Sequence, residues 1–219
     1  MQRTGLYLAI PQRRWPSAYA VVRRLFDVIA ASLLLVILSP LLLLIALAVA
    51  ADSGLPILYR FERLGRHGER MTVLKFRTMR DGSHHHLQDL LSTDEARALE
   101  YRINRKLRND PRRTRIGTFL RRMSLDELPQ LVNVLVGQMS LIGPRPYFPD
   151  ELLDRPEALE ILSVRPGITG LWQVNGRSDR TFEERVAFDV AYVRRGGIGV
   201  DARILVGTVA AVLSGRGAY

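Results

Sequence analysis

SLDELPQLVNVLVGQMSLIGPRP, residues 124–146, combines an acidic pair, an apolar helical pattern and a proline-rich turn. The acidic pair is Asp126 and Glu127, and apolar residues recur after it at the spacing of an α-helix. Those apolar residues are Leu128, Leu131, Val132, Leu135, Val136 and Met139. The pattern predicts a helix that buries one side and carries both carboxylates in its first turn.

Two start positions for this helix stay open. If Ser124 is the N-cap, Ser124 and Glu127 form a capping box, but Pro129 then falls at the fifth helical position and wastes a hydrogen bond. If Asp126 is the N-cap, Pro129 falls at the third position, where a missing N–H is no loss. We favour the second start. In either case both carboxylates lie at the positive end of the helix dipole, which favours their ionised form and an anion beside them.

Arginines flank the acidic pair, with Arg121 and Arg122 before it and Arg145 after it. Arg145 stands between two prolines, which restrict the backbone that carries its guanidinium. Carboxylates beside arginines are the residue types that phosphate chemistry with a divalent metal uses. Taken alone, the S-x-x-E pattern favours an ordinary capped helix that has a surface charge pair, and the rest of the chain decides between the two interpretations.

The composition indicates an anionic partner. The 219 residues have a net charge of +10, and nearly all the positive charge is Arg, because Lys occurs only at positions 75 and 106. Nucleic acid, a phospholipid surface and a phosphorylated substrate all fit this charge. An apolar content of 47% argues against disorder, and the absence of Cys excludes disulfides and thiolate chemistry.

Residues 28–51 contain no charged side chain. The run is longer than the roughly 20 apolar residues that cross a bilayer, so we expect membrane insertion. Pro40, after Ser39 at the middle of the run, cannot continue the helical hydrogen bonding and predicts a kink. Basic residues flank the run at both ends, which favours a broken helix that enters and leaves on one face over a single span. These flanking residues are Arg23, Arg24, Arg60, Arg63 and Arg66.

The remaining segments give a coarse outline. Residues 1–24 mix arginines with Trp15 and Tyr19, which suits lipid headgroups or a solvated basic arm. We expect strands at 57–61 and 71–79 around a turn at 65–68, with Lys75 and Arg77 on one strand face. Helices are predicted at 93–108, 182–193 and 201–213, and a short strand at 168–177. Three consecutive histidines, His84 to His86, are expected in a solvated loop and not in a metal site.

Six motifs occur in a fixed order along the chain. They are the apolar element with its central Ser-Pro, LYRFERLGRHGE, KFRTM, SLDELPQL through GPRP, RPGITGLWQVNGR and a late FD–YV. Together they resemble the bacterial sugar transferase family, the monotopic polyprenol-phosphate phosphoglycosyl transferases. The resemblance begins near residue 23 and covers nearly all that follows. It matches the short, catalytic-core form, since no further transmembrane bundle precedes the apolar element.

The resemblance implies a reaction and roles for individual residues. A nucleotide diphosphate sugar, usually a UDP-sugar, would give its phosphosugar to Asp126 and release UMP. A polyprenol phosphate would then attack the covalent intermediate, with Mg²⁺ (or Mn²⁺) held by Asp126 and Glu127. The resemblance further assigns phosphate binding to Arg121 and Arg145 and links Lys75 and Asp189 to activity. Ser39 and Pro40 would break the membrane helix into a re-entrant hairpin.

The expected fold class is therefore α+β. Residues 1–56 would form the basic arm and the membrane-embedded re-entrant helix. Residues 57–219 would form a small catalytic domain of helices and short strands with interfacial amphipathic helices, facing the cytoplasm at the bacterial inner membrane. The expected partners are a nucleotide sugar, polyprenol phosphate and the lipid bilayer, with a second copy of the chain as a further candidate and without nucleic acid. The alternative is a membrane-tethered basic protein that binds anionic lipid or nucleic acid without catalysis.

Overall fold

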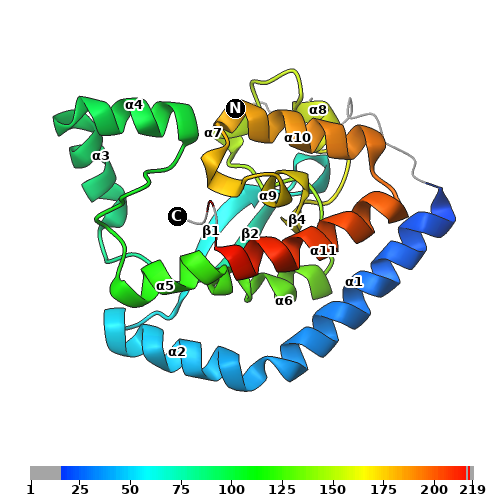
Figure 1. The fold of residues 1–219 in the computed structure, drawn as a ribbon, viewed down its shortest axis with the longest axis horizontal. Coiled ribbons are helices and arrows are strands. Elements are labelled where there is room, and N and C mark those ends of the chain that lie inside the picture. The colour runs from blue at the N-terminus through cyan, green and yellow to red at the C-terminus, as the bar shows by residue number, and fades with distance from the viewer. Residues whose placement is uncertain (1–15, 216, 218–219) are drawn as a thin grey trace.

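A long bent helix pair lies beneath a domain of short helices and two small sheets (Figure 1). The computed structural model describes residues 16–215 and residue 217. The expectations for the basic arm at Arg3, Arg13, Arg14 and Trp15 lie outside these residues. Both sheets have two strands, so the chain is a mixed helix and strand protein as predicted.

The bent pair consists of α1 (Ser17–Ile37) and α2 (Ser39–Ser53), which meet at an angle of 63°. The break falls at the predicted Ser39-Pro40 step, where the Ser39 hydroxyl donates to the Val36 carbonyl at 2.8 Å. Among the described residues no single helix is both long and apolar enough to cross a membrane, whereas the two helices together pass that test of length and composition.

Polar contacts hold both ends of the bent pair against the same domain. Near the start of α1, Arg24 donates to the Val134 carbonyl at 2.6 Å, and Asp27 accepts from the Leu141 amide at 2.9 Å. At the end of α2, Asp52 accepts from the Ile116 amide at 3.2 Å. Arg24 is therefore not simply a basic flank of an apolar run, because its guanidinium holds α1 on the domain.

The predicted hairpin is confirmed. Strand β1 (Leu58–Leu64) pairs antiparallel with β2 (Arg70–Phe76) around a turn that contains η2 (Arg66–Gly68). Strand β2 ends before the predicted residue 79, since Arg77 turns away to bind the Leu55 carbonyl at 3.1 Å. The expectation that Lys75 and Arg77 act together on one strand face is therefore wrong.

The second sheet pairs β3 (Ser140–Ile142) in parallel with β4 (Gly167–Thr169). The strand predicted at 168–177 is wrong beyond Thr169. The chain continues there into the helical turns α9 (Leu171–Val174) and η4 (Arg177–Asp179), because α9 packs its apolar side chains against the neighbouring helices and not along a strand.

The acidic pair lies in a 3₁₀ turn, η3 (Leu125–Glu127), between α5 (Arg115–Met123) and α6 (Gln130–Leu135). Neither predicted helix start is correct, because α6 begins only after Pro129. Proline has no N–H for the Leu125 carbonyl, and the Leu128 amide fills that place with an i to i+3 bond of 3.3 Å. The carboxylates therefore precede the helix.

The remaining helices cover the domain. The His84–His86 triplet falls in the first turn of α3, and not in a loop as expected. The described residues contain no group of three or more His, Cys, Asp or Glu side chains that could hold a metal ion. The predicted helix at 93–108 ends early at residue 104, and the two C-terminal helices are confirmed with slightly wider bounds. These elements are α3 (Ser83–Thr93), α4 (Glu95–Asn104), α7 (Pro149–Leu152), α8 (Ala158–Ile161), α10 (Phe182–Arg195) and α11 (Ile198–Ser214).

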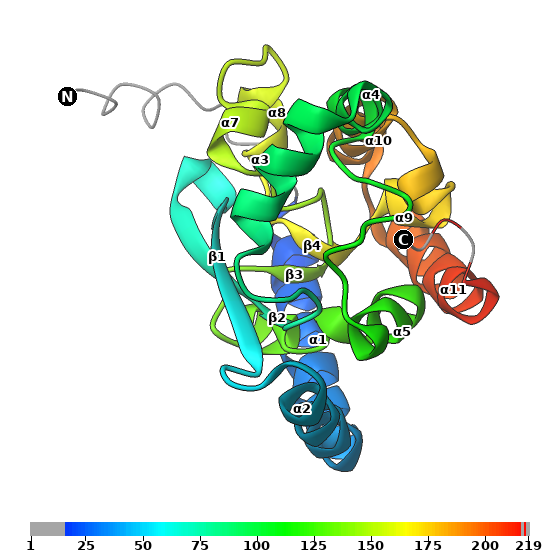
Figure 2. The same cartoon turned by 90° about the vertical axis from the view of Figure 1, so that its left-hand side faces the viewer.

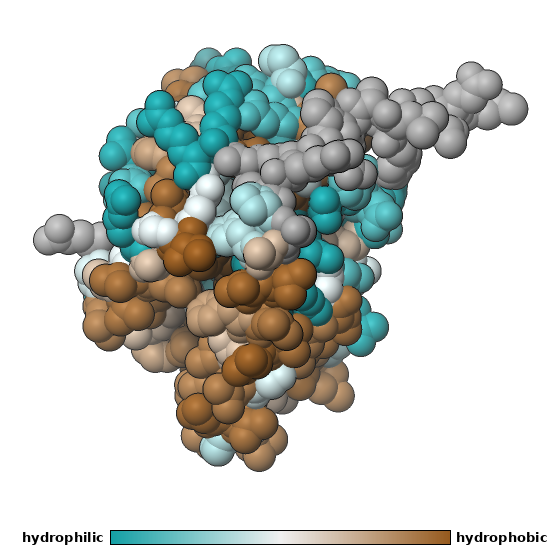
Figure 3. Space-filling view, turned by 90° about the vertical axis from the view of Figure 1, so that its right-hand side faces the viewer, coloured by the Kyte–Doolittle hydropathy of each residue, from teal (hydrophilic) through white to brown (hydrophobic). Residues whose placement is uncertain are grey.

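The core lies between the two sheets, α6, α10 and α11, and the hairpin and α11 lie on opposite sides of β3 and β4 (Figure 2). It includes Val73, Val134, Met139 and Tyr192, all fully buried. The predicted inward face of α6 is wrong at two of its residues, since Val132 is 40% exposed and Val136 is 65% exposed. Apolar residues also dominate the lower surface of the molecule, which α1 and α2 form in large part (Figure 3).

Candidate functional site

The site is built around the η3 turn, which holds two chemically similar carboxylates in different surroundings. The preceding residue, Ser124, has a left-handed backbone with φ 56° and ends α5. The chain therefore reverses sharply before Asp126 and Glu127. The Asp126 side chain is 6% exposed, whereas that of Glu127 is 34% exposed.

Strand β2 brings Lys75 to the acidic pair. The Lys75 ammonium lies 2.5 Å from Glu127 Oε1 and 3.7 Å from Asp126 Oδ2. Asn133 of α6 fixes this placement, because its side chain donates to the Thr72 carbonyl at 2.7 Å and accepts from the Leu74 amide at 3.2 Å. These two bonds hold α6 against the edge of β2.

The surroundings separate the pKa values of the two carboxyls. Burial raises the pKa of Asp126, and repulsion from Glu127 adds to the rise, although Lys75 and Arg121 oppose it. Burial also disfavours ionised Glu127, but its salt bridge with Lys75 and the charge of Lys106 outweigh burial and lower its pKa. The turn therefore holds one more basic, enclosed carboxylate beside one readily ionised carboxylate.

Two arginines approach the carboxylates from either side of the turn. Arg121, in the last turn of α5, donates from Nε to the Thr78 hydroxyl at 2.9 Å, and its charge acts on Asp126. Arg177, in η4, donates to the Ser124 hydroxyl and, at 3.1 Å, to the Ala211 carbonyl. Because both guanidinium groups bind structural partners, they are fixed in place before any ligand arrives.

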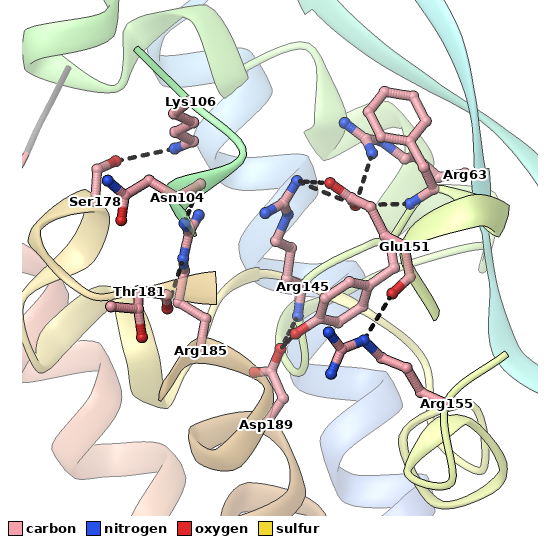
Figure 4. A network of polar contacts seen from close by, with 12 residues as sticks. Arg63, Asn104, Lys106, Arg145, Glu151, Arg155, Ser178, Thr181, Arg185 and Asp189 are labelled. Atoms are coloured by element: carbon pink, nitrogen blue, oxygen red, sulfur yellow. Dashed lines mark hydrogen bonds and ion pairs between the residues drawn. The ribbon is translucent and has the colours of Figure 1, made fainter. Parts of the chain in front are cut away.

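Arg145 stands in the turn after β3, held by a carboxylate network (Figure 4). Its Nη2 donates to both oxygens of Glu151, at 3.2 and 3.3 Å. Arg63 also lies 3.4 Å from Glu151, so one buried carboxylate serves two guanidinium groups. The other terminal nitrogen of Arg145, Nη1, is buried and has no hydrogen-bond partner.

Asp189 of α10 lies behind this turn and is fully buried. Its Oδ2 accepts from the backbone amide of Arg145 at 3.0 Å and from the hydroxyl of Tyr147 at 2.7 Å. Burial raises the pKa of Asp189 to about 7, although both hydrogen bonds oppose the rise. These contacts indicate that Asp189 positions the backbone of Arg145.

Lys106 also lies at this site, in the connection after α4 (Figure 4). Its ammonium donates to the Ser178 hydroxyl at 2.9 Å. Burial and the charges of Arg145 and Arg185 hold the pKa of Lys106 well below its usual range, with Glu127 partly opposing them. The sequence analysis did not select Lys106, although its rarity was a usable signal: only positions 75 and 106 are Lys.

The structure therefore brings four predicted residues to one turn, Lys75, Arg121, Asp126 and Glu127. It places Arg145 at a neighbouring position, with Asp189 behind it. The residues that sequence reasoning missed are Lys106, Glu151, Ser178 and Arg185, together with Arg177, which was noted in a motif but not selected. No local sequence pattern marks these residues, because their contacts join segments that are far apart in the chain.

The acidic pair suits a divalent cation that is shared with a phosphate ligand. Mg²⁺ is commonly bound by one or two carboxylates together with substrate phosphates, while water completes its shell. Asp126 and Glu127 supply two carboxylates, and the exposed part of Glu127 leaves one of them accessible. The residues present thus fit a divalent ion that binds together with a phosphate ligand.

Comparison with known proteins places the sequence among sugar transferases. The family model described as "Bacterial sugar transferase" matches residues 18–215. A protein named "Exopolysaccharide production protein ExoY" from Sinorhizobium fredii is 44% identical over 200 residues, which cover 91% of this chain and 88% of that protein.

Two longer relatives are named for their reactions. "Undecaprenyl-phosphate galactose phosphotransferase" from Salmonella typhimurium is 44% identical over 199 residues, covering 90% of this chain and 42% of that protein. "UDP-glucose:undecaprenyl-phosphate glucose-1-phosphate transferase" from Escherichia coli is 36% identical over 208 residues, covering 91% of this chain and 42% of that protein. This chain thus spans less than half the length of these two relatives.

Proposed function

This chain belongs to the bacterial sugar transferase family, and from that membership we propose that it transfers a phosphosugar to a membrane polyprenol phosphate. The donor would be a nucleotide diphosphate sugar, with UDP-sugars as the first candidates, and the product would start a polysaccharide or glycoconjugate. The names of relatives support this substrate pair. The observation that carries the proposal is the buried Asp126 among Glu127, Lys75 and Arg121.

In the first step, Asp126 acts as the nucleophile. One carboxylate oxygen forms a bond to the sugar-bearing phosphorus, while the bond from that phosphorus to the bridging oxygen breaks and its electron pair leaves with UMP. The raised pKa of Asp126 makes its carboxylate the more basic of the two, which favours nucleophilic attack. Lys75 and Arg121 neutralise charge on the transferred phosphoryl group.

In the second step, an oxygen of the polyprenol phosphate attacks the same phosphorus and releases Asp126. The product is a polyprenyl diphosphate sugar, and the enzyme returns to its starting state without a net proton change at Asp126. Glu127 remains ionised because of its bond to Lys75. We assign to Glu127 the orientation of the acceptor phosphate and, together with Asp126, the binding of the divalent ion.

Asp126 and Glu127 would hold Mg²⁺ or Mn²⁺ together with the donor phosphates. The bound ion would supply positive charge that neutralises the diphosphate. Arg145 would bind a further phosphate oxygen through its free Nη1. Asp189 and Glu151 serve this contact indirectly, because they fix the backbone and the guanidinium of Arg145.

The acceptor is a lipid, so we propose that the bent pair enters the cytoplasmic face of the inner membrane and returns to it. With 15 residues, α2 is about 22 Å long, which is shorter than a hydrocarbon core of about 30 Å. Both ends of the pair contact one domain, whereas a span would place them on opposite sides. The apolar lower surface supports the same placement (Figure 3).

Asp126→Asn tests the reaction. Membranes with the full chain are incubated with Mg²⁺, polyprenol phosphate and a panel of radiolabelled UDP-sugars, and both UMP release and protein-bound label are measured. We expect Asp126→Asn to lower UMP release by roughly 10³-fold or more and to abolish the protein-bound label. The melting temperature should change little, since the Asn amide has the same shape as the Asp carboxylate and Lys75 retains its salt bridge with Glu127.

Glu62→Gln is the matched control, because it neutralises an exposed carboxylate of β1 that pairs with Arg70. Its UMP release should equal that of the wild type. Retention of labelling by Asp126→Asn would refute the nucleophile assignment. Release of UMP from none of the sugars by the wild type would refute the proposed reaction.

A further inference from the structure

The two lysines of the chain both lie near Glu127. Among 32 Lys and Arg residues only Lys75 and Lys106 are lysines. Lys75 forms a salt bridge with Glu127, and the charge of Lys106 also acts on Glu127. An ammonium is a compact point charge with three donors, whereas a guanidinium is planar and wide. Two ammonium groups in one site of an Arg-rich chain therefore indicate a chemical requirement at both positions.

More cations than carboxylates act on Lys106. Arg145, Arg185 and Lys75 act on it as like charges, whereas Glu127 and Asp126 act on it as opposite charges. Lys106 and Arg185 also share the ring of Trp172, at 5.7 and 5.6 Å from its centre. Within the described chain Lys106 forms no ion pair, and its ammonium donates one hydrogen bond, to Ser178.

The neighbouring Arg145 also has a side-chain nitrogen that donates no hydrogen bond. Glu151 accepts from Nη2, and the buried Nη1 lacks a partner. In Figure 4 the side chains of Lys106, Arg185 and Arg145 come from three separate segments and gather in one region. Enclosed positive charge that exceeds the charge of the nearby carboxylates is unfavourable unless an anion joins it. A phosphate supplies both the charge and the acceptor atoms.

We propose that Lys106 and Arg145 form a phosphate-monoester subsite beside the acidic pair, which binds the phosphate that leaves with the nucleotide. The inference rests on the proposed function and extends it to the leaving group. When Asp126 bonds to the sugar-bearing phosphorus, the bridging oxygen departs with its electron pair and becomes a terminal oxygen of the nucleotide phosphate. That oxygen gains charge as the bond breaks, and the ammonium of Lys106 stabilises it.

The acceptor lipid carries the same chemical group. A polyprenol phosphate is also a phosphate monoester, and it attacks the phosphorus after the nucleotide has left. One subsite could therefore hold either phosphate in turn. The test must separate a nucleotide source from a lipid source.

Amine acylation reads occupancy of the subsite directly, because the chain offers only two lysine side chains. The full-length protein in detergent is treated briefly with an amine-acetylating reagent, and modification at each lysine is quantified by mass spectrometry. The reaction is repeated with UMP, with uridine and with farnesyl phosphate. We expect UMP to slow acetylation of Lys106 and uridine to leave it unchanged. Protection by farnesyl phosphate would show that the lipid phosphate uses the same subsite.

Lys106→Met measures the contribution of the ammonium to binding. We expect the inhibition constant of UMP to rise by about 10- to 100-fold, as for the loss of one charge-assisted hydrogen bond. Arg108→Met is the matched control, because Arg108 joins the same two segments through Asp179, 3.0 Å away, and both side chains are exposed. Its inhibition constant should match that of the wild type.

The outcomes separate this inference from the proposed function. An active wild type whose Lys106 is not protected by UMP would overturn the nucleotide-phosphate subsite, whether or not farnesyl phosphate protects it, and would leave the reaction intact. An equal rise of the UMP inhibition constant in Lys106→Met and Arg108→Met would also overturn it. Loss of the contact between the two segments would then explain both effects. Failure of the reaction itself would appear as absent UMP release by the wild type.

Discussion

Asp126 and Glu127 show how two adjacent carboxylates acquire different properties from their neighbours. The Lys75 ammonium lies closer to Glu127 than to Asp126, and Asp126 is more deeply enclosed. Burial therefore sets the direction of the pKa shift at Asp126, whereas at Glu127 the salt bridge with Lys75 and the charge of Lys106 together outweigh burial. A difference of this kind supports the proposal that Asp126 is the nucleophile.

Asp189 provides a residue-scale prediction about pH. In the folded protein it keeps its proton up to about pH 7, whereas an unfolded chain loses it near pH ~4. Between these values the folded state binds more protons, so the free energy of unfolding falls as pH rises, by up to about 1.4 kcal/mol per pH unit. This stabilising contribution is complete below pH ~4 and lost by about pH 7.

Asp189→Asn has no proton to lose at this position. We therefore expect its free energy of unfolding, relative to that of the wild type, to increase between pH 4.5 and pH 7. Urea unfolding in detergent, followed by tryptophan fluorescence, measures the difference. Asp179→Asn removes an exposed carboxylate and serves as the control, with a constant difference. A constant difference for Asp189→Asn as well would contradict the raised pKa.

At the scale of elements, α5 positions the acidic turn through a close backbone contact. A Cβ added at Gly117 would lie 2.1 Å from the Thr78 carbonyl oxygen. Thr78 also accepts from the Thr114 amide at the start of α5 and from Arg121 near its end. Thr78, which follows β2, thus fixes the helix that leads into the acidic turn.

Gly117→Ala should therefore separate α5 from Thr78. We expect a loss of about 1–3 kcal/mol of unfolding free energy, as for overpacked sites, together with reduced UMP release because the turn moves. Gly199→Ala is the matched control, because a Cβ at that helical position meets no atom within 4 Å. That variant should gain about 0.5–1 kcal/mol. Equal stability of the two variants in urea unfolding would argue against the tight contact.

At the scale of the whole molecule, the bent pair joins the apolar surface to the polar domain. Tyr19 and Tyr192 both donate to Asp201, at 2.5 and 2.8 Å, so the start of α1 is tied to α10 and α11. At the other end, Ile45 and Val49 of α2 pack with Phe76 and Leu120. The domain therefore reinforces the bend that Pro40 begins.

This arrangement predicts the topology in a membrane. Because the chain has no native Cys, single cysteines can replace the exposed Ala18 and Ser92, one before the apolar run and one after it. In sealed inner-membrane vesicles, a membrane-impermeant maleimide should label both positions from the same side. A cysteine engineered into a known periplasmic loop of another protein provides the control for sealing. Labelling from opposite sides would show a single span.

The sequence predicted the elements that depend on local chemistry. The break at Ser39-Pro40 follows from a missing backbone donor, and the hairpin at 58–76 follows from strand-favouring runs around glycines. The sequence also identified Asp126, Glu127, Lys75 and Arg121, because these residues belong to motifs that occur in a fixed order along the chain. The start of α6 was misplaced. It depends on which amide binds the Leu125 carbonyl, and the periodic pattern of apolar residues does not describe that choice.

The sequence by itself determined the apolar re-entrant candidate, the acidic pair, the excess of Arg and the family to which the chain belongs. Only the tertiary structure decided that Lys106 lies near Glu127, that Glu151 and Asp189 hold Arg145, and that Arg24 holds α1 on the domain. The physical reason is range. Periodicity, proline and charge runs act over a few residues, whereas these contacts join segments that are dozens of residues apart or arise where buried charges must find partners.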